Sequence, residues 1–146
     1  MNENTCFTQF AIVGTFDPDE ITKRLGLEPD DTVKMGEHLR ANRSADIARW
    51  DFGKCNVYDV YTDNQMKKTI APLLDKIDEL KAIARDYKVE MYLNVVPSLT
   101  TGRISPALAP SLEVMSFCVA TGTKIDIDLY LLERDYSDDK NDEYDD

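Results

Sequence analysis

Basic side chains cluster in one segment of a chain that is otherwise acidic. The whole chain carries a net charge of −11, yet the segment 32–50 holds four lysine and arginine side chains against two acids. Guanidinium groups bind carboxylates and phosphates through paired hydrogen bonds and stack on aromatic rings. The segment therefore predicts a binding site for a small anion, formed by Lys34, His38, Arg40, Arg43, Arg49 and Trp50. The alternative is that Trp50 anchors the core and that the bases pair with surface acids.

Two aspartates near the C-terminus offer a different chemistry. Asp126 and Asp128 alternate within the segment 124–132 and would share one face of a strand. Glu90 would join them if its strand were a neighbour. Carboxylates grouped in this way hold a hard cation or act as an acid and base pair. Alternating aspartates are equally typical of a solvated strand face, so the metal interpretation of Asp126 and Asp128 has a plain alternative.

The sequence lacks the usual motifs for catalysis. It contains one histidine, His38, which excludes a histidine-rich zinc site or a histidine dyad. Cys55 follows Lys54 and is the most accessible thiol candidate, but no third residue that would orient a cysteine and histidine pair can be named. There is no phosphate-binding loop, no GxGxxG and no GxSxG segment. We therefore expect a protein that is not an enzyme and that has no cofactor.

More than half of the net charge lies at the C-terminal end. The segment 133–146 contains eight acids and two bases, which gives −6 of the total of −11. Such a run cannot bury apolar surface, so we expect a disordered acidic tail after a single domain at 1–132. Negative charge disfavours binding to nucleic acid and to anionic membranes. The tail either solubilises the protein or contacts a basic partner.

Length and composition bound the class of protein. With 146 residues the chain can bury the core of one domain without disulfides or metal. Its three cysteines form no CxxC pair and are odd in number, which favours reduced thiols. The N-terminus lacks a basic region followed by an apolar run, and no segment approaches the roughly 20 apolar residues of a membrane span. We therefore expect a cytoplasmic protein.

Hydrophobic periodicity and turn residues predict the order of helices and strands. The first half contains a strand at 6–13 buried on both faces, a helix at 17–26 with Asp17 as its cap and Gly26 as its stop, and a long loop at 30–46. A half-buried strand follows at 47–52, with Ala48, Trp50 and Phe52 on one face, and a turn at 53–54 leads into a strand at 55–61. The second half contains an amphipathic helix at 64–86, a strand at 89–96, a helix at 110–121 and a strand at 124–132. The long helix contains Pro72, so it either kinks there or begins near Ile70. The helix at 110–121 is expected to face inward with Leu112, Met115, Cys118 and Val119.

This order amounts to two strand-helix-strand halves joined by the long helix. The simplest arrangement is an α+β fold of the ferredoxin-like kind, a split β-α-β sandwich with a mainly antiparallel sheet and helices on one face. Such a sheet has exposed edges, so pairing of two copies into a homodimer is a further possibility.

Several short motifs occur in an order that resembles one bacterial family. These motifs are FxIxG at 10–14, DPDEITKRLGLEP at 17–29, KxG at 34–36, the single Trp50 and IDIDLY at 125–130. Together they resemble the family catalogued as domain of unknown function 4279, over nearly the whole chain before the tail. The resemblance implies a bacterial single-domain protein without an established activity, and it carries over no catalytic residue.

The leading hypothesis for function is a non-enzymatic protein-interaction module. Small acidic inhibitor and immunity proteins act in this way, and here the sheet or the acidic tail would contact a protein partner. The alternative is a small-anion sensor that uses the segment 34–50. A third hypothesis, an enzyme that uses Asp126 and Asp128, requires an activity that a double asparagine variant would lose.

Overall fold

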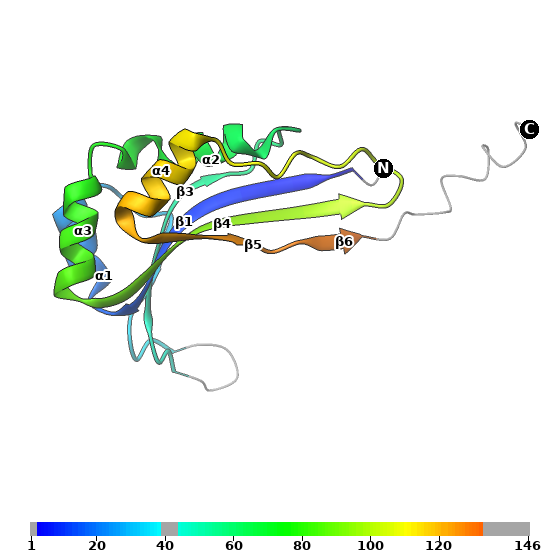
Figure 1. Ribbon diagram of the computed structural model, residues 1–146. Helices are drawn as coiled ribbons and strands as arrows, with labels where there is room; N and C mark the ends of the chain where they lie inside the picture. The colour runs from blue at the N-terminus through cyan, green and yellow to red at the C-terminus, as the bar shows by residue number, and fades with distance from the viewer. Residues whose placement is uncertain (1–2, 39–43, 133–146) are drawn as a thin grey trace, which may run out of the picture.

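The computed structural model describes residues 3–38 and 44–132, and its helices and strands form two layers (Figure 1). In chain order the elements are β1 (Thr5–Thr15), α1 (Pro18–Leu25), β2 (Asp31–Val33), β3 (Ala48–Cys55), α2 (Thr62–Ile70), η2 (Ala71–Leu73), α3 (Ile77–Asp86), β4 (Lys88–Thr100), α4 (Leu112–Thr121), β5 (Thr123–Ile127) and β6 (Tyr130–Leu132). The predicted acidic tail at 133–146 lies outside the described residues. Among the helices of the described ranges, none is long and apolar enough to cross a membrane.

The strands form one mixed sheet. β1 lies in its interior and pairs antiparallel with β3 and β4, while β2, which falls within the predicted loop at 30–46, pairs antiparallel with β3. At the other edge, β5 and β6 both pair parallel with β4. The predicted α+β class is therefore confirmed. The ferredoxin-like topology is not confirmed, because β1 and β3 flank α1 in the chain and are direct antiparallel neighbours. A split β-α-β unit instead holds its two strands parallel around a third.

The helices cover one face of the sheet and leave the other face open. In Figure 1, α2 and α4 lie above the strands, and α1 and α3 lie together at one end of the sheet. Side-chain exposure follows the same division, because Phe10 and Ile12 of β1 are fully buried while Phe7 and Gln9 are partly exposed. The strand predicted at 6–13 is thus buried mainly on one face rather than on both.

The helix α1 begins and ends where the sequence predicts. Oδ1 of Asp17 accepts a hydrogen bond from the N–H of Asp19 at 3.0 Å, as an N-cap residue does. Gly26 has a φ of 65°, and its N–H donates to the carbonyl oxygen of Thr22 at 2.8 Å. A left-handed glycine of this kind is the usual end of a helix.

The predicted strand at 55–61 is wrong. Gly53 and Lys54, the expected turn, belong to β3, which continues to Cys55. The register of β1 and β3 shifts at this point, as in a β-bulge. Gly53 has a φ of +74°, and a Cβ atom there would lie 2.7 Å from the carbonyl oxygen of Thr69. A glycine that signals a turn in the sequence therefore forms a bulge within a strand.

The predicted helix at 64–86 is two helices rather than one that is kinked. α2 ends at Ile70, the short 3₁₀ turn η2 contains Pro72, and α3 begins at Ile77. Proline has no N–H for the helical hydrogen bond and its ring clashes with the preceding turn, so the helix is interrupted there. The apolar stripe persists across the break, and its buried members are Met66, Ile70, Leu73 and Leu80.

The inward face of α4 differs from the prediction. Leu112 and Val119, expected to face the core, are 78% and 84% exposed, and Met115 is 39% exposed. Of the predicted set Cys118 is buried, and the other buried residues of α4 are Val114, Phe117 and Thr121. Because apolar residues surround this helix on all sides, periodicity does not determine which side faces inward.

The last predicted strand, at 124–132, is observed as β5 and β6. Its apolar face contacts the core only near the beginning of the strand. Ile125 is partly buried, whereas Leu129 and Leu131 are 53% and 74% exposed. Figure 1 shows the reason, because this strand runs away from α4. β4 also runs further than predicted, past the expected end at residue 96 to Thr100.

A buried glutamine attaches α2 to the sheet. Nε2 of Gln65 donates hydrogen bonds to the carbonyl oxygens of Cys6 at 2.9 Å and Cys55 at 3.0 Å. Its Oε1 accepts from the N–H of Asp59 at 3.2 Å, and its own carbonyl oxygen accepts from Oγ1 of Thr8 at 3.0 Å. One side chain therefore links β1, β3 and the loop before α2, and its polar atoms are all paired.

Candidate functional site

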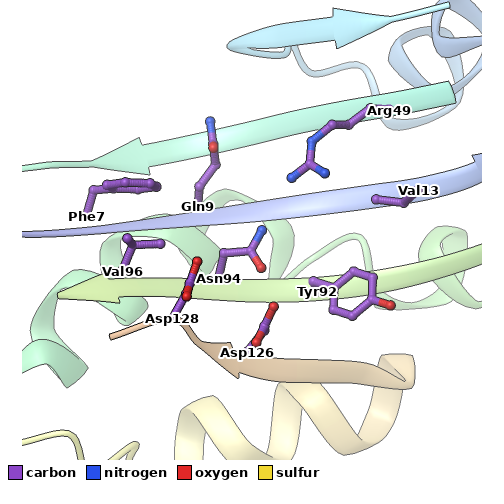
Figure 2. Close-up of a pocket in the computed structure, with 9 residues that line it drawn as sticks. All are labelled: Phe7, Gln9, Val13, Arg49, Tyr92, Asn94, Val96, Asp126 and Asp128. Carbon is purple, nitrogen blue, oxygen red and sulfur yellow. The ribbon is translucent and has the colours of Figure 1, made fainter. Parts of the chain in front are cut away.

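A groove crosses the open face of the sheet. It has a volume of about 440 Å³, and its lining residues, drawn in Figure 2, are Phe7, Gln9, Val13, Arg49, Tyr92, Asn94, Val96, Asp126 and Asp128. Figure 2 shows Arg49 on the β3 side, Asp126 and Asp128 on the β5 side, and Gln9 and Asn94 between them. One cation and two anions therefore lie on opposite sides of a strip of amide side chains.

Strand pairing places the central groove residues in one row. Gln9 of β1 faces Asn94 of β4, and Asn94 faces Asp126 of β5. Neighbouring strands lie about 4.8 Å apart, so this row spans roughly 10 Å from Gln9 to Asp126. Asp128 lies two residues further along and shares the same face. The sheet itself thus brings residues that are far apart in the chain into one surface.

Arg49 and Asp51 form an ion pair on the open face of β3. Nε of Arg49 lies 2.9 Å from Oδ1 of Asp51, and the side chains are 41% and 13% exposed respectively. Burial raises the pKa of the Asp51 carboxyl and outweighs the Arg49 guanidinium, which lowers it. Asp51 therefore holds the guanidinium beside the groove, although burial disfavours the charged form of its own carboxyl group.

Replacing Asp51 with asparagine is expected to change how stability depends on pH. The pKa of Asp51 in the folded chain lies above its ordinary value of 3.8, so between these two pKa values the folded state binds more protons than the unfolded state. The Asp51 contribution to the free energy of unfolding therefore falls as the pH rises from 3.8 through the folded-state pKa. Asp51→Asn should lack this fall, which urea denaturation at a series of pH values would measure.

The control for this experiment is Asp75→Asn, which changes an exposed aspartate between η2 and α3 that does not contribute to the pKa of Asp51. It should keep the pH dependence of the wild-type chain. A stability difference between wild type and Asp51→Asn that stays constant from acid to neutral pH would contradict the assignment.

A second polar cluster stands next to the groove. The hydroxyl of Tyr92 donates to the carboxylate of Glu90, and Nζ of Lys124 lies 3.4 Å from Oε1 of Glu90. Both contacts lower the pKa of Glu90, the tyrosine hydrogen bond more strongly. Within the described part of the chain, the side chains of Asn94 and Asp126 have no hydrogen-bond or ion-pair partner. These two groups are therefore the polar side chains of the groove best placed to bind a ligand.

Trp50 does not share this surface with Arg49. Its side chain is fully buried under the helices, and the ring stacks on Phe52 with a centroid distance of 5.4 Å and an angle of 7°. Its indole N–H donates to Oγ1 of Thr22 in α1 at 3.0 Å. Adjacent residues of a strand point to opposite faces, so Trp50 has a place in the core and Arg49 has one on the open face.

The other predicted anion-binding residues lie apart from the groove. Nζ of Lys34 pairs with Oδ2 of Asp19 at 2.8 Å, and both side chains are exposed. His38 is exposed and forms an isolated antiparallel bridge with Ser44. Arg40 and Arg43 lie outside the described residues. Of the six predicted residues, the structure thus places Arg49 in the groove lining.

The two aspartates of the metal hypothesis do lie in the groove, across from Arg49. β5 is a neighbour of β4, as the grouping with Glu90 required, but Glu90 is bound by Tyr92 and Lys124 and does not line the groove. Among the described residues, no three or more His, Cys, Asp or Glu side chains are grouped so that they could hold a metal ion. Asp126 and Asp128 are exposed, the amide of Asn94 lies beside Asp126, and Arg49 lies on the other side of the groove.

Sequence reasoning missed most of the polar groove residues. Gln9, Asn94 and Tyr92 occupy alternate positions in strands that were identified, and Asp51 alternates with Arg49. The period of two therefore indicated which residues share a face. It did not indicate which strands are neighbours, so Arg49 and Asp126 were assigned to separate hypotheses although they line one groove.

Comparison with known proteins gives one match. A family model described as Domain of unknown function (DUF4279) matches residues 4–132. No curated protein and no solved structure matches the chain.

Proposed function

We propose that this chain, which belongs to the family Domain of unknown function (DUF4279), is a non-enzymatic module that binds a protein partner through the open face of its sheet. The observation that carries the proposal is the groove on that face. Arg49 lies on one side of it and Asp126 and Asp128 lie on the other, with amide side chains between. Charges of both signs in a fixed arrangement are complementary to a partner surface that carries the opposite pattern.

The composition of the groove also supports a binding role. Phe7, Val13 and Val96 contribute apolar contact area beside the polar row, and protein interfaces combine such apolar area with a polar surround. Asp126 and Asp128 are the lining residues that could act as a base, and the lining includes no histidine, cysteine or serine that would accompany them as a nucleophile or a second base. The described helices lie on the opposite face, so a partner can reach the groove without moving them.

A variant with a large side chain in the groove tests this function. Gln9→Arg places a long cationic side chain in the centre of the groove, where Oδ2 of Asp30 already accepts a hydrogen bond from Gln9 at 3.1 Å. The new side chain should pair with Asp30 and block a partner without disturbing the core. The matched control is Ala84→Arg, which adds the same side chain at an exposed site of α3.

Affinity capture from lysate of the source cells, quantified by mass spectrometry, is the measurement. Wild type and Ala84→Arg should recover the same partner, and Gln9→Arg should recover at least about tenfold less of it, which corresponds to a loss of about 1.4 kcal/mol. Recovery of no partner at micromolar bait concentration, or equal recovery by all three chains, would refute the proposal.

One observation favours a second candidate function, a sensor for a small anion. The groove volume of about 440 Å³ lies within the range of small-molecule sites, about 300–1,000 Å³, and Arg49 is partly exposed at its side. A carboxylate or phosphate ligand would compete with Asp51 for the guanidinium. Calorimetric titration with a panel of such metabolites tests this, and Arg49→Gln should abolish any binding found. Fluorescence of Trp50 is the wrong readout, because that side chain faces the helices.

A further inference from the structure

β5 and β6 are two parts of one edge strand. Their pairs with β4 keep the same register. The N–H of Asp128, which lies between them, donates to the carbonyl oxygen of Val95 at 2.9 Å. The ladder is interrupted after this bond because Pro97 has no N–H to donate back. The chain from 123 to 132 therefore runs as one extended strand along the edge of the sheet.

The outer side of this edge strand carries backbone groups without a strand partner. Successive N–H groups of a strand point to alternate sides. Because the N–H of Asp128 points toward β4, those of Ile127, Leu129 and Leu131 point outward. No described strand lies on that side. An edge of this kind is a template for the addition of a further strand.

The side chains of the edge strand show which sequence such a strand would have. On the helix side, the apolar Ile127, Leu129 and Leu131 are 42%, 53% and 74% exposed. On the open side, Asp126 and Asp128 are exposed, and the neighbouring cation Lys124 is bound by Glu90. Soluble proteins usually protect an edge with charges on its exposed positions. Here one side is apolar and the other is acidic.

Charge favours a different partner over a second copy of this chain. In an antiparallel pair of two such edges, the registers centred on Asp126, Ile127 or Asp128 each set aspartates directly opposite one another, and the register centred on Leu129 sets them opposite Leu132 and Tyr130 rather than opposite a base. Like charges in directly opposed positions destabilise a strand pair, and opposite charges stabilise it. A segment with basic residues at alternate positions fits the acidic side, and apolar residues between them fit the other side.

We propose that this edge binds an extended segment of a partner protein by strand addition. Basic residues of the segment would face Asp126 and Asp128, and apolar residues would face Ile127, Leu129 and Leu131. Backbone hydrogen bonds supply affinity in this mode of recognition, and the alternating side chains supply specificity. The edge shares Asp126 and Asp128 with the groove, but its outward backbone groups and its apolar side chains are separate from the groove, so variants at Leu129 distinguish the two proposals.

A short synthetic peptide tests the edge directly. The probe is a fluorescent, end-capped nonapeptide of alternating valine and lysine, and the matched probe replaces each lysine with glutamate. In fluorescence anisotropy titrations of the full chain, the lysine peptide should bind at least tenfold more tightly than the glutamate peptide. Amide shifts in NMR spectra should concentrate at residues 125–131.

Four variants make the result decisive. Leu129→Pro removes an outward N–H that the sheet itself does not use, so it should weaken lysine-peptide binding at least tenfold, while Leu129→Thr keeps the N–H and should lose less. Asp126→Asn with Asp128→Asn should remove most of the preference for lysine over glutamate. Gln9→Arg fills the groove and should leave peptide binding within about twofold of wild type.

Several outcomes would overturn the proposal. Equal binding of the two peptides, amide shifts located away from the edge strand, or a Leu129→Pro chain that binds as well as wild type would each refute it. Sedimentation velocity tests whether a second copy of the chain binds the edge instead. A wild-type dimer that becomes a monomer in Leu129→Pro would assign the edge to a second copy and refute the proposal. Peptide binding with no partner for the groove would leave this proposal standing and the groove proposal refuted.

Discussion

Trp50→Ala is expected to lower the free energy of unfolding by about 3–5 kcal/mol, the usual cost of removing a large aromatic side chain from a core. Trp50 is the largest of the fully buried side chains, and it packs between the sheet and α1. Alanine would leave a cavity beside Phe52 and would leave Oγ1 of Thr22 without its indole donor. Urea denaturation followed by circular dichroism measures the change, since the variant lacks the tryptophan signal.

Two comparisons separate the contributions to this loss. Tyr61→Ala removes an aromatic side chain that is 63% exposed, and it should change the stability by less than about 0.5 kcal/mol. Thr22→Val keeps the core volume but leaves the indole N–H unpaired, which should cost about 1–3 kcal/mol. A loss of less than about 1 kcal/mol for Trp50→Ala would mean that Trp50 is not the core anchor that its burial indicates.

Gln65→Met is expected to cost about 3 kcal/mol, although it changes the size of the side chain little. The loss comes from three groups that would be left without a partner, namely the carbonyl oxygens of Cys6 and Cys55 and the N–H of Asp59. A buried polar group that loses its partner costs about 1–3 kcal/mol, and the partly exposed members of this set are at the low end. The same denaturation experiment provides the measurement.

Gln65→Glu tests whether hydrogen bonding rather than packing causes this loss. Glutamate has nearly the same shape, but its carboxylate accepts and cannot donate, so the carbonyl oxygens of Cys6 and Cys55 would again lack a donor. Protonation restores one donor, and Gln65→Glu should therefore become more stable relative to wild type as the pH falls. A Gln65→Met chain within about 1 kcal/mol of wild type would show that α2 is held by apolar contacts instead.

Signals that act within a few residues of the chain were read correctly. The cap at Asp17 and the left-handed Gly26 define α1, and the alternation of Ala48, Trp50 and Phe52 places them on the core face of β3. In each case the residue that carries the signal also makes the hydrogen bond or the contact that forms the element. Such features depend little on the rest of the fold, so the sequence alone suffices for them.

Signals that depend on distant partners were misread. Pro72 divides a helix, whereas Pro97 does not end β4, because β4 keeps its pairs with β1 there although Pro97 interrupts the pairing with the edge strand. In α4, apolar residues on every side left the inward face to be decided by packing against β5 and α3. The candidate site failed for the same reason, because the groove exists where β1, β3, β4 and β5 meet, and strand order is not a local property.

The position of β1 has a consequence for how the chain folds during its synthesis. β1 pairs with β4 from Thr15 opposite Lys88 to Thr5 opposite Ser98, so the ribosome completes β1 long before it reaches β4. At about 5–20 residues per second, a nascent chain waits several seconds with one side of β1 unoccupied. Only β3 is available to it earlier. Pairings so distant in sequence form slowly, and during synthesis they leave the free side of β1 open to aggregation.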